Sequence, residues 1–277
     1  MNISKESATL LTHEECNITA QPEHKFPTGD IAMYAISVLF GLPTHSYVLW
    51  LIATGAGRGI ASEIFILNVS VCEIVFCLRS LICALANDFP KLWEIVMFLT
   101  GIVITGRFFQ CLICVERYLA VVHPVTFLKY KPLRYKVACS IVTWIANLIS
   151  CVFCMRFINP CFKYHFAYFY LSQFSVYLSI NLFCCLAVLR ALKQPGPGER
   201  GGEKNMKGRA FYVILTTTVT LLIIYVPSIF MSLRYLLSIP SFPGLDSLSL
   251  ICYLIAGFVQ PLHFIYRVGK LPLCKCN

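Results

Sequence analysis

A glutamate and an arginine stand side by side where a long apolar segment of this chain gives way to a basic one. They are Glu116 and Arg117, followed by Tyr118, and the chain upstream from about Trp93 is almost wholly apolar. Ionisable residues within a membrane are costly unless paired, and are functional candidates by default. Anchoring of a helix end by long charged side chains is the simpler interpretation. The adjacency of the two charges, with an aromatic residue and the helix-ending Pro124, favours a functional site.

Two further charges lie deep inside apolar segments. Glu73 belongs to an apolar run at residues 62–86, and Arg107 stands ten residues before Arg117, which places it about 15 Å deeper along a helix. A carboxyl group at that depth needs a partner or a proton. One prediction is an ion pair between Glu73 and Arg107, because they are the deepest opposite charges in the sequence. Arg79, six residues after Glu73, points to another side of its helix.

The composition excludes an ordinary soluble protein. Hydrophobic residues make up 58% of the 277 residues and charged residues only 13%, which is outside the range of soluble globular domains. The length suffices for seven membrane helices of about 20 to 25 residues, without a large soluble domain. In a membrane protein the net charge of +10 marks cytoplasmic loops. We therefore expect the lipid bilayer, and not a nucleic acid, as a partner.

The apolar segments predict an all-α membrane protein, a seven-transmembrane helix bundle. We expect residues 1–30 to form a tail, residues 31–266 the helical domain, and residues 267–277 a second short tail that begins with an amphipathic surface helix. The helices are expected at residues 31–53, 62–86, 92–122, 135–155, 166–192, 207–237 and 248–266. Two loops are expected at residues 156–165 and at the Pro- and Gly-rich residues 195–202.

Lys and Arg are unevenly distributed between the two ends of the expected bundle. Of the 23 such residues, 15 lie on the side of Arg117 and six on the opposite side. Cytoplasmic loops carry the excess of positive charge, so the N-terminus is expected outside the cell and Arg117 in the cytoplasm. Sequons at Asn2 and Asn17 agree with this orientation as glycosylation candidates. We expect a multi-pass protein of the plasma membrane.

The residues around Arg117 also carry a resemblance to a known family. Glu116-Arg117-Tyr118, continued by Leu-Ala-Val-Val-His-Pro, resembles the acidic-Arg-Tyr motif of rhodopsin-like (class A) G-protein-coupled receptors. With the apolar segments, the resemblance covers nearly the whole chain. It implies that Glu116 holds Arg117 in an inactive state and that Arg117 contacts a heterotrimeric G protein in an active state. The Gly-Leu-Pro-Thr run of the first segment is reminiscent of the branch with nucleotide, protease-activated and carboxylic-acid receptors.

Other motif positions of the family are partly matched. Pro227 and Pro261 match the prolines of the sixth and seventh helices, and Pro227 is expected to kink its helix. The family's Asn, Asp, Trp, Asn and Tyr are replaced, in chain order, by His45, Glu73, Tyr225, Gln260 and Phe264. The resemblance assigns the last three and both prolines to the conformational switch. We group His45 and Glu73 with Arg107 as a polar core.

The sixth segment lacks one restraint that is common in the family. Lys207 stands where many relatives carry an acidic residue that holds the arginine of the motif. Because two cations repel each other, Lys207 is not expected to restrain Arg117. We therefore expect any restraint in the resting state to come mainly from Glu116.

Several of the 15 cysteines are candidates for modification. The family's cysteine near the start of the third helix is absent, so its disulfide is expected to be missing, and Cys16 and Cys161 are the candidates for a replacement. Cys274 and Cys276 suit S-palmitoylation, although unmodified tail cysteines are equally consistent. Most others lie in apolar runs, where they pack as small hydrophobes. The sequence predicts no metal site and no cofactor.

The leading hypothesis is a receptor that binds an extracellular ligand and activates a heterotrimeric G protein. Four cations are expected in the outer half or at the outer mouth of the bundle: Arg79, Arg156, Lys163 and Arg234. They suit a small ligand with a carboxylate or phosphate group. Interfacial anchoring by the same side chains is equally consistent.

Two other classes of protein are weighed against the receptor. The five replaced motif residues are consistent with a decoy or scaffold that has the shape of a receptor and does not signal. A membrane transporter is less favoured, because no internal repeat with paired broken helices is visible. An enzyme is not expected, since no nucleophile, base and orienting group converge.

Overall fold

The computed structural model describes residues 28–55, 60–86, 88–130, 132–156, 163–193, 201–239 and 244–268. These residues are largely helical, and no strand occurs among them. Their elements are α2 (Thr28–Ile36), the π-helix η2 (Ser37–Gly41), α3 (Leu42–Ala53), α4 (Ile60–Ala86), α5 (Leu92–Gly106), α6 (Phe108–Val122), α7 (Pro124–Tyr130), α8 (Leu133–Arg156), α9 (Lys163–Lys193), α10 (Gly201–Leu236) and α11 (Leu245–Arg267).

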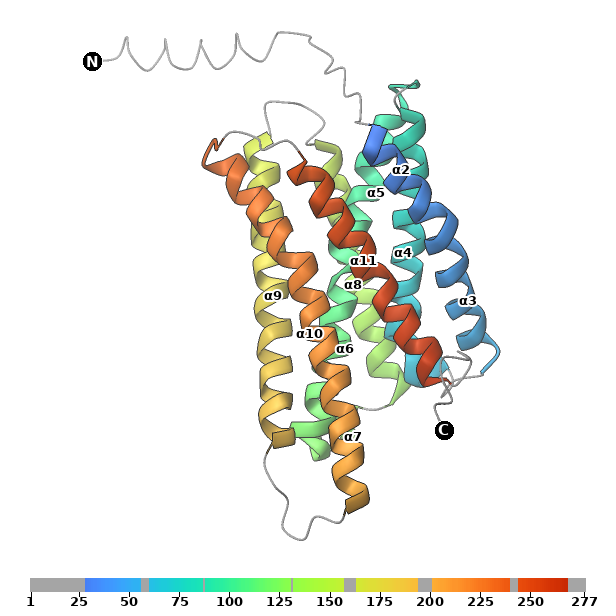
Figure 1. Ribbon diagram of the computed structural model, residues 1–277, viewed down its shortest axis with the longest axis vertical. Helices are drawn as coiled ribbons and strands as arrows, with labels where there is room; N and C mark the ends of the chain where they lie inside the picture. The colour runs from blue at the N-terminus through green and yellow to red at the C-terminus, as the bar shows by residue number, and fades with distance from the viewer. Residues whose placement is uncertain are drawn as a thin grey trace, which may run out of the picture.

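The long elements form a bundle aligned roughly along one axis (Figure 1). α2, η2 and α3 continue into one another as the first rod of this bundle, and α5 and α6 form the third. Within the described residues, six rods are apolar over a length that can cross a membrane: Gly29–Ala53, Glu63–Ala86, Leu92–Val122, Leu133–Arg156, Tyr164–Leu192 and Ser247–Tyr266. The described apolar part of α10 is the shorter Thr218–Arg234. The described residues thus form an all-α bundle of seven rods, and the length of the apolar rods indicates a multi-pass membrane protein.

Several helices extend further than the sequence predicts. Arg156, expected in a loop, is the last residue of α8, and Lys163 is the first residue of α9. α10 begins at Gly201, inside the expected Pro- and Gly-rich loop. Within a membrane every backbone N–H and C=O group must be satisfied internally, which favours long helices. The ends of apolar runs therefore underestimate the ends of these helices.

One short helix, α7, was not predicted. It lies at the end of the bundle where α3 and α11 finish (Figure 1). The third rod ends at His123, whose φ of −130° and ψ of 65° are not helical. Pro124 then begins α7, because the fixed φ of proline suits the first position of a helix. Pro124 thus ends one helix, as expected, and also starts the next.

The third rod is interrupted at its middle. α5 ends at Gly106 and α6 begins at Phe108, with Arg107 between them. The amide of Gln110 donates to the carbonyl oxygen of Arg107 over 3.0 Å, the shorter i to i+3 bond of a tightened turn. α5 packs chiefly against α4 and α8, whereas α6 packs chiefly against α9. The two halves of the rod therefore have different principal neighbours.

α8 has a polar buried face and an apolar exposed face. The buried residues include Ser140, Thr143, Asn147 and Ser150, and the exposed ones include Val142, Ile145, Leu148, Ile149 and Val152. This inverted pattern suits a helix whose outer face meets lipid. α8 also approaches α5 closely, because a Cβ atom added at Gly101 would lie 2.5 Å from the Cα atom of Cys151.

Candidate functional site

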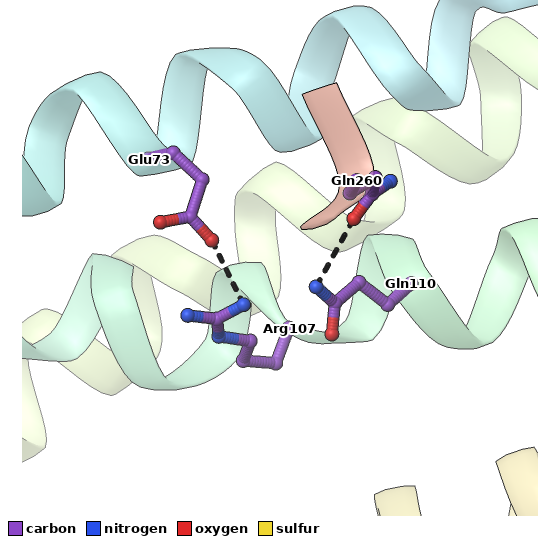
Figure 2. A network of polar contacts seen from close by, with 4 residues as sticks. All are labelled: Glu73, Arg107, Gln110 and Gln260. Atoms are coloured by element: carbon purple, nitrogen blue, oxygen red, sulfur yellow. Dashed lines mark hydrogen bonds and ion pairs between the residues drawn. The ribbon is translucent and has the colours of Figure 1, made fainter. Parts of the chain in front are cut away.

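The deepest charges of the chain form a buried ion pair. The Nη1 atom of Arg107 lies 2.8 Å from the Oε1 atom of Glu73, and the two side chains are 3% and 7% exposed (Figure 2). The guanidinium carbon of Arg107 also lies 4.0 Å from the ring centroid of Tyr253 on α11, a cation–π contact. The ion pair predicted from the sequence is therefore present. With Tyr253 it connects α4, the third rod and α11.

His45 brings the first rod into this polar core. Its side chain is buried and lines a small cavity together with Ser37, Glu73 and Tyr253. The Nδ1 atom of His45 has no hydrogen-bond partner among the described residues. A neighbouring cavity is lined by Glu73 and Arg107. Glu73 thus lines one cavity with His45 and another with Arg107, so the three residues grouped from the sequence lie in one region of the bundle.

A pair of glutamines lies next to the ion pair. Gln110 on α6 donates from Nε2 to the Oε1 atom of Gln260 on α11 over 3.3 Å (Figure 2). Gln260 replaces the family's Asn and was predicted to matter, whereas Gln110 was missed. Gln110 stands three residues after Arg107, so the two share a helix face. That spacing is the feature of the sequence that could have indicated a role for Gln110 in the polar core.

A pocket between α6, α10 and α11 contains Arg117. The two glutamines border it, and its lining consists of Gln110, Ile113, Cys114, Arg117, Thr216, Thr220, Leu221, Val259, Gln260 and His263. Thr216, Thr220 and His263 were not predicted, because isolated polar residues in apolar helices gave no sign that they face one another. The structure therefore places the arginine of the motif against residues of two other helices.

The acidic residue of the motif, Glu116, lies against a lysine of a neighbouring helix. Its ion pair is with Lys136 on α8, and the Nζ atom of Lys136 lies 2.5 Å from the Oε1 atom of Glu116. Successive residues of a helix point about 100° apart, so Glu116 faces α8 whereas Arg117 faces the pocket beside α10 and α11. The structure thus gives Glu116 a partner on α8 that the sequence did not predict, and the restraint of Arg117 by Glu116 stays a prediction.

Tyr118 and Tyr225, two aromatic residues predicted to act in coupling or switching, both pack against α9. The hydroxyl group of Tyr118 lies 3.0 Å from the Nε2 atom of His123, and its ring lies 5.7 Å from that of Phe183 on α9. Tyr225 is fully buried and packs against Phe174 and Tyr177 of α9. These contacts fix the packing of α9 against α6 and α10.

The remaining switch residues belong to α10 and α11. Phe264 packs into an apolar cluster with Val48 and Leu51 of the first rod. Pro227 lies inside α10 and Pro261 inside α11, and both helices continue through their prolines. The kink expected at Pro227 stays a prediction.

The four cations proposed for ligand binding lie in different surroundings. Arg79 donates from Nε to the Oγ1 atom of Thr100 on α5 over 2.8 Å. Arg234 is buried on α10, and Arg156 is exposed at the end of α8. The side chain of Lys163 is not described. None of the three cavities described above is lined by these four residues, and their role stays a prediction.

Other predicted sites fall outside the described residues. They are the glycosylation candidates Asn2 and Asn17, the cysteine pair Cys16 and Cys161, the lipidation candidates Cys274 and Cys276, and the C-terminal surface helix. All of them stay predictions. Among the described residues, the cysteines are free thiols and most are buried.

Comparisons with known proteins support the fold. No protein-family model matches the chain. Human chemokine XC receptor 1 is 26% identical over 178 residues, which cover 58% of this chain and 53% of that receptor. Mouse C-C chemokine receptor type 8 is 23% identical over 222 residues, covering 70% and 60%. The G-protein coupled receptor homolog Q2/3L of sheeppox virus (strain KS-1) is 25% identical over 239 residues, covering 76% and 61%.

The matches thus span only about half to three-fifths of the length of these relatives. Two are named chemokine receptors, so they do not test the likeness to the nucleotide, protease-activated and carboxylic-acid branch. Their names and the bundle of apolar helices both support a G-protein-coupled receptor fold for this chain. These relatives, at identities of 23–26%, support the interpretation of the chain as a divergent rhodopsin-like (class A) G-protein-coupled receptor.

Proposed function

We propose that this chain is a plasma-membrane receptor that binds an extracellular ligand and activates a heterotrimeric G protein, with its N-terminus outside the cell. The observation that supports this most directly is the position of Arg117, which lines a pocket between α6, α10 and α11. An arginine at the mouth of a helix bundle, with apolar and polar residues of two other helices around it, can receive a segment of a partner protein.

Activation in this proposal is a shift between two conformations. A ligand that binds the open conformation more tightly raises its population. α10 then moves at Pro227, where the missing backbone N–H removes one helical hydrogen bond. Because Thr216, Thr220 and Leu221 of α10 line the pocket of Arg117, this movement widens the pocket. The basic residues near Arg117 would face the G protein and anionic lipid.

Replacement of Arg117 by alanine tests the proposal. We expect Arg117→Ala to abolish nucleotide exchange on a panel of heterotrimeric G proteins, while the amount of protein at the cell surface stays unchanged. Lys91→Ala is the matched control, because Lys91 is an exposed cation at the opposite end of the bundle. Exchange at the wild-type rate in Arg117→Ala would overturn the role of this residue. A wild-type protein that promotes no exchange would support the decoy instead.

Two classes of ligand follow from different observations. The names of two relatives favour a chemokine. The cations Arg79 and Arg234 favour a small carboxylate or phosphate. A screen of chemokines and of small anions for stimulated nucleotide exchange separates the two. Loss of an anion's effect in Arg79→Glu and Arg234→Glu, with a chemokine's effect retained, would support the small anion.

A further inference from the structure

Two exposed cations lie against two tyrosines where α7 is followed by α8. The Nζ atom of Lys129 lies 5.8 Å from the ring centroid of Tyr130, and the guanidinium carbon of Arg134 lies 4.9 Å from that of Tyr135. The two tyrosine rings meet edge to face, with their centroids 5.3 Å apart. The Nη2 atom of Arg134 also donates to the hydroxyl oxygen of Tyr135 over 3.4 Å. The four side chains therefore form one connected group, here called the basic–aromatic cluster.

The positive charge of this cluster is not balanced by an ion pair with a described carboxylate. Lys129 and Arg134 are both exposed, and neither takes part in the ion pairs between described residues. The sequence contains no Asp or Glu between Glu116 and Glu199. A surface that concentrates one sign of charge attracts partners of the opposite sign. The cluster therefore fits an anionic partner.

Arg134 lies on the exposed apolar face of α8. Ile141, Ile145 and Val152 follow it at intervals of seven, four and seven residues, and each is more than half exposed. Residues at such intervals share one face of a helix, and an apolar outer face meets lipid in a membrane. Arg134 belongs to the first turn of the apolar span Leu133–Arg156. Its guanidinium group is thus placed at the depth of the lipid headgroups.

α7 adds exposed apolar side chains to the same region. Val125 is 81% exposed and Leu128 is 64% exposed, and their spacing of three residues places them on one side of the helix. Exposed apolar side chains beside cations are typical of segments that lie at a membrane surface, and tyrosines are enriched at this level. A soluble anion would satisfy the cations alone. A lipid with an anionic headgroup would contact the apolar side chains as well.

We propose that the basic–aromatic cluster binds the phosphorylated headgroup of a phosphoinositide in the inner leaflet. The face of the guanidinium group of Arg134 rests on Tyr135, which leaves N–H groups at its edge to bind phosphate oxygens in parallel pairs. Lys129 supplies a second cation for another phosphate group. The inference rests on the proposed function only in placing this end of the bundle at the cytoplasmic leaflet, where anionic lipids lie. The lipid contact itself requires no G protein.

Native mass spectrometry of the protein in detergent micelles, titrated with dioctanoyl phosphatidylinositol bisphosphate, tests this site without any assumption about orientation. The variants are K129Q, R134Q, K129Q/R134Q and K91Q. Because one cation beside an anionic lipid surface raises affinity about fivefold, we expect each single variant at the cluster to bind about fivefold more weakly and the double variant about 25-fold. K91Q is the matched control, because Lys91 is an exposed cation at the opposite end of the third rod, and it should bind as the wild type does.

Two further probes separate the lipid from other sources of the same charge. Phosphatidylserine has an anionic headgroup without additional phosphate groups, and binding as tight as that of the bisphosphate lipid would overturn the preference for a phosphoinositide. Inositol trisphosphate carries the headgroup without acyl chains. We expect it to bind more weakly than the lipid, because it cannot contact the apolar side chains of α7 and α8, and equal affinity would overturn the assignment to a lipid.

The position of the site can fail separately. Wild-type affinity in K129Q/R134Q, or an equal loss in K91Q, would overturn the assignment to the basic–aromatic cluster. Melting temperatures of all variants are measured alongside, and we expect them to match the wild type because the changed side chains are exposed.

A last measurement distinguishes the lipid from a protein partner. Nucleotide exchange by G proteins is followed in nanodiscs with and without the phosphoinositide. Lowered exchange in K129Q/R134Q, together with no lipid binding by the wild type, would assign the cluster to the G protein and overturn the lipid site. A wild-type protein that binds the lipid but promotes no exchange would overturn the proposed function and leave the lipid site standing.

Discussion

At the scale of single residues, two ion pairs between described residues join different helices. Arg107 binds Glu73 at the centre of the bundle, and Lys136 binds Glu116 near one end. The central pair is almost fully buried. Such a pair contributes little net stability compared with apolar residues, yet breaking it leaves one charge without a partner. Substitutions of Glu73 and Arg107 should therefore have strongly non-additive effects on the stability of the protein.

We predict this coupling for Glu73 and Arg107. Glu73→Gln and Arg107→Met alone should each destabilise the protein by about 3–5 kcal/mol, whereas the double variant should lose much less than the sum. Thermal unfolding in detergent, followed for the four proteins of the cycle, measures the difference. Additive losses would mean that the two side chains do not depend on each other.

At the scale of elements, close helix approach depends on small residues. Gly101 of α5 lies against the backbone of Cys151 on α8, where an added Cβ atom would lie 2.5 Å from Cα and 2.6 Å from N. Backbone atoms cannot move aside as a flexible side chain can. The polar buried face of α8 adds hydrogen-bonding groups to the same contact. The packing of α5 on α8 is therefore expected to tolerate glycine and little else at residue 101.

We predict that Gly101→Ala separates α5 from α8 and destabilises the protein by at least about 1–3 kcal/mol. Lower surface expression and a lower melting temperature of the purified protein are the expected results. Gly29→Ala is the matched control, because an added Cβ atom there meets nothing within 4 Å. Equal stability of the two variants would contradict the close approach.

At the scale of the whole molecule, the two ends of the bundle differ in charge. The excess of Lys and Arg lies at the end with Arg117, which predicts a cytoplasmic position for α7. We expect Lys129→Cys on α7 to react with a membrane-impermeant maleimide only after cells are permeabilised. Lys91→Cys, exposed at the other end, should react in intact cells. Both signals are compared with the wild-type background from native cysteines, and reversed labelling would contradict the orientation.

The sequence was sufficient for the bundle and for the central ion pair, because apolar length and deep opposite charges are strong signals. It was not sufficient for the partner of Glu116. In the sequence Lys136 is one of several cations near Arg117. Its burial beside Phe65 of α4 depends on tertiary packing, which the sequence does not show. Gln110 and His263 were not predicted, because the sequence position of a neutral polar residue does not indicate which residues of other helices it contacts. α7 was missed because Pro124 can both end and start a helix.

The interruption at Arg107 separates two halves of the third rod that pack against different helices. α5, before it, packs against α4 and α8, and α6, after it, packs chiefly against α9. A displacement of the first residues of α5 would thus act on α4 and α8 as well as on α6. Its transmission to α6 would depend on Arg107 between the two helices, which is held by its ion pair with Glu73 and by its contact with the ring of Tyr253.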